Sequence, residues 1–289
     1  MRLRWNSLLK SQAGALIPLL SGLCLATGPA AAGAKPQLTW INQFEHGQDL
    51  AEKSARPMLI DFWASWCGPC RRMDRESWAD KAVIEASQRY VSIAVDVDKD
   101  KAAGSRYQVH ELPTVILADP WGRPLVRRSG FIYPHDLAAL LGSVPADFTP
   151  VRETHEILAH DVHNASALAL MGKFYTTAGA FDFAIEYYKD AMRTQEGKSS
   201  PQLRSELCLA VGADQLLLRN WNDARKTLRQ FLKDFPDSPH TDEALLGLVL
   251  ADCKQGKVND AEKELATLKE QFPLSHSTET AARVFARKK

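Results

Sequence analysis

The ten-residue run Asp61-Phe62-Trp63-Ala64-Ser65-Trp66-Cys67-Gly68-Pro69-Cys70 constrains the fold of this chain more than any other feature. The apolar segment Met58-Leu59-Ile60 precedes it and predicts a short buried strand that ends in an acidic residue. We expect a helix to begin at the cysteine pair, where two cysteines at this spacing can form a disulfide and exchange it with other thiols. A second segment of interest, Leu112-Pro113-Thr114, follows about 40 residues after the run. The run therefore predicts a strand, a turn and a helix with redox chemistry at the turn.

Helical and strand patterns alternate from Leu38 to about Ser143, which predicts an α/β sheet. A parallel strand pair joined by a helix has its site at the carboxyl ends of the strands, and Cys67 lies at such an end. We expect helices over 44–55, 69–77, 81–87, 99–107 and 135–141, and strands over 57–63, 90–97, 114–118 and 125–128.

A repeated helical pattern replaces the strand pattern in the second half of the chain. Ala184, Ala224 and Ala261 each end the same four-residue pattern, which begins with an apolar residue. The spacings between these alanines are 40 and 37 residues, longer than the ~34 of a tetratricopeptide repeat, which the pattern otherwise resembles. The equivalent positions are Gly172, Gly212 and Val249 twelve residues before each Ala, Tyr188, Leu228 and Leu265 four after, and Ala191, Phe231 and Leu268 seven after.

The two patterns divide the chain. We predict an α/β domain over 36–146, a linker from Asp147 to Pro150 and an all-α repeat domain over 151–289. A half-unit over 155–164 precedes the repeats, and a capping helix over 278–287 covers the last apolar face.

Residues 1–32 are typical of a secretion signal. Arg2, Arg4 and Lys10 precede the apolar stretch from Ala13 to Ala26, and small residues follow around Ala32. We expect cleavage, with an uncleaved anchor as the alternative. A lipoprotein at Cys24 is disfavoured, because Leu23 precedes it instead of a small residue. Each reading places the body of the protein in the periplasm or another extracytoplasmic space, where disulfides persist.

Composition excludes some classes of function. The net charge of +1 gives no electrostatic basis for nucleic-acid binding. Cys208 occupies an apolar position of a repeat helix, so we predict a core thiol. Cys253 lies in the equivalent helix of the next repeat but eight positions out of register, about 12 Å along a helix, so we predict no disulfide between the two. His155, His160 and His163 do not share one helical face, so we predict exposed histidines and no metal site.

The first half resembles thioredoxin. The resemblance rests on Asp61 to Ala64, Trp66 to Cys70, Pro113-Thr114 and the later Gly122 and Gly130. Trp40, Lys53-Ser54-Ala55-Arg56-Pro57 and Ser77-Trp78-Ala79-Asp80 resemble the periplasmic C-terminal domain of the membrane electron conduit of the disulfide-bond (DsbD) family. The fold class that follows is an α/β thioredoxin fold with an all-α tetratricopeptide-like repeat domain after it.

The resemblance implies catalytic roles. Cys67 would attack as a thiolate, stabilised by the helix N-terminus, and Cys70 would resolve the mixed disulfide. Asp61 would have a pKa raised by burial and would accept the proton of Cys70. Pro113 would be cis and would oppose Cys67, leaving the backbone of Leu112 free to pair with substrate. The Cys67–Cys70 disulfide would be the redox-active group, with no other cofactor and no metal.

Further positions follow from the same resemblance. Many thioredoxins carry a Lys that faces the buried Asp, and here the matching residue is Ala94. Gly68-Pro69 is the dipeptide of reducing members. We predict Trp63 in the core and Trp66 on the docking surface. The substrate-binding surface would consist of Trp66, Gly68, Pro69, Leu112 and Thr114.

These inferences predict an extracytoplasmic thiol:disulfide oxidoreductase, with a reductase favoured. Its expected partners are protein thiols and disulfides, a membrane electron donor and a protein bound by the repeats. One alternative is an adaptor in which the repeats carry the function and the thioredoxin fold is accessory. The other is an enzyme of the opposite direction, an oxidase or isomerase.

Overall fold

A four-stranded sheet forms the first half of the protein in a computed structural model that describes residues 38–287. The strands β1 (Met58–Trp63), β2 (Val91–Asp96), β3 (Thr114–Ala118) and β4 (Pro124–Ser129) lie in the order β2-β1-β3-β4. β1 pairs parallel with β2 and antiparallel with β3, and β3 pairs antiparallel with β4. The predicted α/β sheet is confirmed. β1 is one of its two inner strands, so the cysteine pair follows an inner strand.

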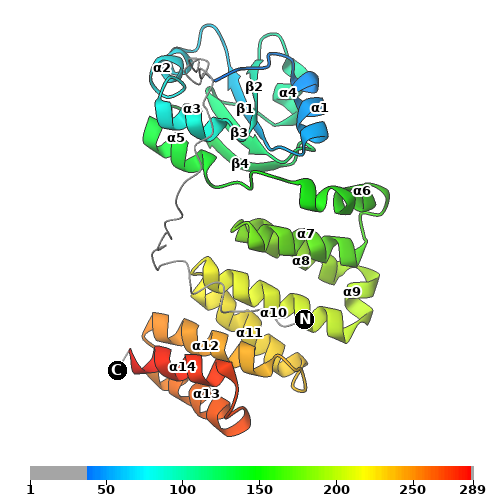
Figure 1. The fold of residues 1–289 in the computed structure, drawn as a ribbon, viewed down its shortest axis with the longest axis vertical. Coiled ribbons are helices and arrows are strands. Elements are labelled where there is room, and N and C mark those ends of the chain that lie inside the picture. The colour runs from blue at the N-terminus through cyan, green and yellow to red at the C-terminus, as the bar shows by residue number, and fades with distance from the viewer. Residues whose placement is uncertain (1–37, 288–289) are drawn as a thin grey trace, which may run out of the picture. The chain divides into compact units, whose positions relative to one another are not determined.

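Five helices cover the two faces of this sheet (Figure 1). Because side chains alternate along a strand, Met58, Ile60 and Phe62 pack in one apolar cluster while Leu59 packs in the other. Asp61 therefore shares the face of Leu59, which also holds Met73 of α2. The helices are α1 (Phe44–Ser54), α2 (Gly68–Glu76), α3 (Lys81–Ser87), α4 (Lys101–Arg106) and α5 (Pro134–Leu141).

The second half consists of helices, as predicted. A short 3-10 turn, η2 (Thr149–Val151), leads into α6 (Arg152–His160). Three helix pairs follow: α7 (Ala165–Thr177) with α8 (Phe181–Arg193), α10 (Pro201–Leu217) with α11 (Trp221–Asp234), and α12 (Thr241–Gln255) with α13 (Val258–Gln271). The short helix α9 (Gln195–Ser199) lies between the first two pairs, and α14 (His276–Ala286) ends the array (Figure 1).

The repeat pattern corresponds to close helix crossings. A Cβ atom on Gly172 would lie 2.5 Å from the Tyr188 ring, and one on Gly212 would lie 2.6 Å from Leu228 Cδ2. Small residues at these positions therefore let the two helices of each pair approach. The long spacing between the first two units is explained by α9, whose Gly197 is buried against the backbone of Ala191.

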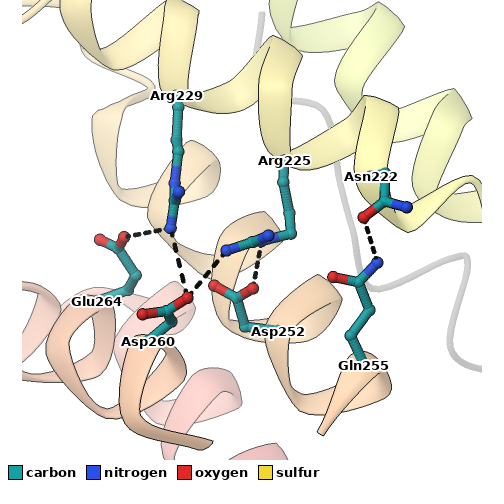
Figure 2. A network of polar contacts seen from close by, with 7 residues as sticks. All are labelled: Asn222, Arg225, Arg229, Asp252, Gln255, Asp260 and Glu264. Atoms are coloured by element: carbon teal, nitrogen blue, oxygen red, sulfur yellow. Dashed lines mark hydrogen bonds and ion pairs between the residues drawn. The ribbon is translucent and has the colours of Figure 1, made fainter. Parts of the chain in front are cut away.

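An ion-pair network joins the second and third helix pairs (Figure 2). Arg225 of α11 pairs with Asp252 of α12 and with Asp260 of α13, the latter at 3.0 Å. Arg229, one turn further along α11, lies 3.9 Å from both Asp260 and Glu264. Asp252 is fully buried, so Arg225 supplies the charge that this carboxylate needs.

The segment predicted as a linker is packed into the structure. Phe148 is fully buried, and its backbone N–H donates to the Ala55 carbonyl at 2.9 Å. Its ring contacts Trp121 of the β3–β4 turn and Tyr175 of α7, and one apolar cluster extends across these residues from both halves. Residues 38–287 belong to one compact unit, and the domain boundaries stay a prediction.

The predicted signal segment lies outside the described residues, and so does most of the C-terminal end beyond Ala286. Between residues 38 and 287, no helix combines the length and apolar character that a membrane crossing requires.

Candidate active site

The cysteine pair lies where β1 ends and α2 begins. Cys67 is the N-cap of α2, and its sulfur accepts a hydrogen bond from the Cys70 backbone N–H at 3.1 Å. Pro69 occupies the first turn of α2, where its lack of an N–H has no cost. Cys67 and Cys70 form a disulfide and are both nearly inaccessible to solvent, at 3% exposure. The structure therefore shows the oxidised state of the pair.

The proline loop lies beside this disulfide. The Leu112-Pro113 peptide bond is cis, as predicted. Leu112 packs against the small cluster formed by Ala64, Cys67 and Cys70. The Pro113 carbonyl accepts a hydrogen bond from the Gly130 N–H at 2.8 Å, which connects the loop to the end of β4.

Thr114, predicted to contact substrate, points inward instead of outward. It is 1% exposed, and its hydroxyl donates to the Glu111 carbonyl at 2.8 Å and contacts Ser129 Oγ at 2.9 Å. These bonds hold the proline loop against β4. The side chain of Thr114 thus orders the loop, and its contact with substrate stays a prediction.

Asp61 is the buried acid of the site. Its pKa is raised to about 7, mainly by burial and then by the Asp74 carboxylate, while the nearby Trp78 indole opposes the shift. Its Oδ1 atom has no hydrogen-bond partner. In the sheet Asp61 faces Ala94 on β2, as the sequence predicted, so this position supplies no cation. Asp74 lies one turn after Cys70 on the same face of α2.

The two tryptophans of the run have different environments. Trp66 is 66% exposed, and its indole N–H donates to Asp98 Oδ2 at 2.9 Å. Trp63 is half-buried and packs against Ala64 and the cysteines. Trp66 thus lies on the surface and Trp63 contributes to the core, as predicted. Gly68 has open space around its Cα, so the turn between the cysteines is accessible.

Sequence reasoning missed four contributors to the site. Asp74 and Trp78 act on Asp61, Asp98 orients Trp66, and Arg72 stacks on Phe131 at 4.0 Å. The position of Asp74 one turn after Cys70 is a signal that could have been used. The partners of Arg72 and Trp66 lie 59 and 32 residues away, and nothing local indicates them.

His155 differs from its prediction as an exposed histidine. It is half-buried and stacks on Trp121 with ring centroids 3.8 Å apart, because α6 packs against the β3–β4 turn. His160 and His163 are exposed, as predicted. Within the described part of the chain, no three His, Cys, Asp or Glu side chains are grouped so as to hold a metal ion.

Comparison with known proteins identifies the family. The thioredoxin family model matches residues 38–131, and a tetratricopeptide repeat model matches residues 212–238. A chloroplastic thioredoxin Y of Oryza sativa subsp. japonica is 31% identical over 133 residues, which are 44% of this chain and 74% of that protein. The chain belongs to the thioredoxin family. The DsbD thiol:disulfide interchange protein of Campylobacter jejuni is 29% identical over 102 residues, 34% of this chain but only 18% of that protein.

A second relative supports the same family. A thioredoxin-like protein of Synechocystis is 33% identical over 88 residues, which are 30% of this chain and 81% of that protein. The chain is a thioredoxin-family thiol:disulfide oxidoreductase with its cysteine pair at the active-site position, fused to tetratricopeptide-like repeats. Proteins of this family act on protein disulfides, and repeats of this kind favour protein–protein contacts.

Proposed function

We propose that this protein is an extracytoplasmic reductase of protein disulfides. The observation that carries the proposal is the buried carboxyl group of Asp61, which has a pKa of about 7. A carboxyl group that titrates near neutral pH can take a proton and return it at the pH where the enzyme works. The Gly68-Pro69 dipeptide favours the reducing direction.

The proposed reaction begins with the reduced dithiol. The Cys67 thiolate, stabilised by the N-terminus of α2, attacks one sulfur of a substrate disulfide, and a mixed disulfide forms as one substrate thiolate leaves. Asp61 accepts the proton of Cys70, and the Cys70 thiolate attacks Cys67. The mixed disulfide breaks and the second substrate thiolate leaves. Two electrons have then passed to the substrate, and the Cys67–Cys70 disulfide seen here is the product.

The partners and the location belong to the same proposal. The signal-like residues 1–32 favour secretion, and the matched region of the DsbD protein favours a membrane electron donor that reduces the Cys67–Cys70 disulfide again. The repeats would bind a protein and hold it near the dithiol.

The reduction potential of the Cys67–Cys70 couple tests the direction. Purified protein is equilibrated with glutathione buffers, and the oxidised fraction is measured. We expect a value near about −270 mV, as for thioredoxin. A value between about −120 and −180 mV is typical of oxidases and isomerases and would reverse the proposed direction.

A further inference from the structure

The sheet order places two different surfaces on either side of Cys67. β2 lies on one side of β1, and the loop after it supplies Asp98, which holds the exposed Trp66. β3 and β4 lie on the other side, where the Pro113 loop and the segment after Ser129 meet. Among residues 38–287, the large apolar side chains that are exposed include two aromatic ones, Trp66 and Tyr133. One belongs to each side of the site.

The β4 side carries an aromatic and cationic cluster, which we call the Arg72 cluster (Arg72, Phe131 and Tyr133). The Arg72 guanidinium carbon lies 4.0 Å from the Phe131 ring centroid and 5.8 Å from that of Tyr133. The two rings contact each other edge to face at 5.1 Å. Tyr133 is 59% exposed, so the cluster faces solvent.

Two hydrogen bonds fix the segment that holds these rings. At one end, the Gly130 N–H donates to the Pro113 carbonyl at 2.8 Å. At the other, the buried Ser77 hydroxyl donates to the Ile132 carbonyl at 2.6 Å and so connects the segment to the end of α2. The cluster is therefore held between the proline loop and α2, the helix that Cys67 caps.

The guanidinium of Arg72 keeps N–H groups that can donate to a further carboxylate. Its hydrogen bonds to Glu76 both use Nε, at 3.0 and 3.1 Å. The Tyr133 hydroxyl is a further side-chain partner of Arg72, and the remaining N–H groups of the two Nη atoms can donate to a carboxylate. The exposed face of α2 carries Arg71, Arg72 and Arg75 against Asp74 and Glu76, an excess of one positive charge.

We propose that Arg72 binds a carboxylate of the substrate protein close to the cysteine that Cys67 attacks. An extended substrate segment that pairs with the backbone of Leu112 passes the Gly130 end of the proline loop, and a side chain one to three residues from the attacked cysteine reaches the Arg72 cluster. Arg72 thereby selects acidic segments as substrates. This proposal rests on the oxidoreductase activity and is independent of the direction of net electron flow.

The test compares matched peptide disulfides. Each peptide carries Glu, Gln or Lys at one position within three residues of the cysteine, and chemically reduced full-length protein is mixed with it at low salt. We expect the second-order rate of exchange to be about threefold higher for the best Glu peptide than for its Gln partner, the size typical of an exposed ion pair. The advantage should decline as salt screens the charges.

Variants at Arg72 determine which charge is responsible. Arg72→Gln should bring the Glu-to-Gln rate ratio to about one, and Arg72→Glu should make the Lys peptide faster than the Glu peptide. Arg75→Gln removes the same charge from the same helix and should leave the ratio as it is. The reduction potential of each variant, measured in parallel, separates a change of the dithiol itself from a change of recognition.

Equal rates for Glu and Gln peptides at every position, or an unchanged ratio in Arg72→Gln, would overturn the proposal. A loss of the preference in Arg75→Gln as well would assign it to the general field of α2 and would overturn it too. An oxidising reduction potential would contradict the proposed reductase but would leave the rate ratio intact, so the two failures are distinguishable.

Discussion

At the scale of single residues, Asp61 predicts how the stability of the folded protein changes with pH. Its pKa is about 7 in the folded protein, against an ordinary value of 3.8. The folded state therefore binds more protons than the unfolded state between these values, and stability falls as pH rises through this window. Asp61→Asn removes the titration and should raise the free energy of unfolding above pH 7, by at most about 4 kcal/mol.

Urea unfolding of both proteins at pH 5 and pH 8 measures the effect. The variant should gain most at pH 8, while its disulfide-exchange rate falls because Cys70 has lost its proton acceptor. Asp49→Asn, which removes a carboxyl exposed on α1, serves as the control. Equal gains at the two pH values would show that Asp61 is not the titrating group.

Residue-scale inference from the sequence succeeded where one local rule acts. The spacing of the cysteines, the position of Asp61 at the end of an apolar strand and the identity of Ala94 are all visible in short segments. The Arg72 cluster was not predictable, because Phe131 lies 59 residues away and only the β4–α5 connection brings it to α2. The inward direction of Thr114 depends in the same way on its partner Ser129.

At the scale of elements, some of the repeated small residues lie where two helices cross closely. Leu228 of α11 is held between two glycines, since Cβ atoms on Gly212 of α10 and on Gly247 of α12 would each lie 2.6 Å from it. The sequence pattern identified Gly212 but not Gly247, which is outside the repeated positions. The ion pairs of Figure 2 could not be predicted from the sequence pattern either, because they join residues of different repeats.

Arg225 should be critical for the joint between the second and third helix pairs. Arg225→Met leaves the fully buried Asp252 without its cation, which should cost about 3–5 kcal/mol at neutral pH. Burial already raises the pKa of Asp252, so acidification should protonate this carboxyl and shrink the deficit. Chemical denaturation at pH 7 and pH 5 measures both effects.

Arg229→Met is the matched control in the same helix. Arg229 is half exposed and its two carboxylate partners are 3.9 Å away, so its loss should cost at most about 1 kcal/mol. Similar costs for the two arginines would show that the buried pair does not stabilise the joint.

At the scale of the whole molecule, the sheet and the repeats share one apolar cluster. Phe148 lies in the segment that composition suggests is a linker, yet its ring contacts Trp121 from the sheet and Phe174 and Tyr175 from α7. Arg123 of the β3–β4 turn adds an ion pair with Glu186 of α8 at 2.6 Å and lies 4.6 Å from the ring centroid of Tyr187. A single buried aromatic residue in a short polar segment produces no hydrophobic periodicity, so its packing role cannot be predicted from the sequence pattern.

These contacts predict that the sheet and the first repeat unfold together. Phe148→Ala removes a fully buried aromatic ring and should cost about 3–5 kcal/mol. Amide hydrogen exchange should show the loss in β1 and β3 as well as in α7, since α7 packs against the missing ring and both strands contribute to the same apolar cluster. Phe231→Ala deletes an equally buried ring between α11 and its neighbours and should lower protection in the repeats more than in β1. If Phe148→Ala lowered protection only around residues 144–151, the sheet and the repeats would be energetically independent, and the repeats would then act on the dithiol only through a bound partner.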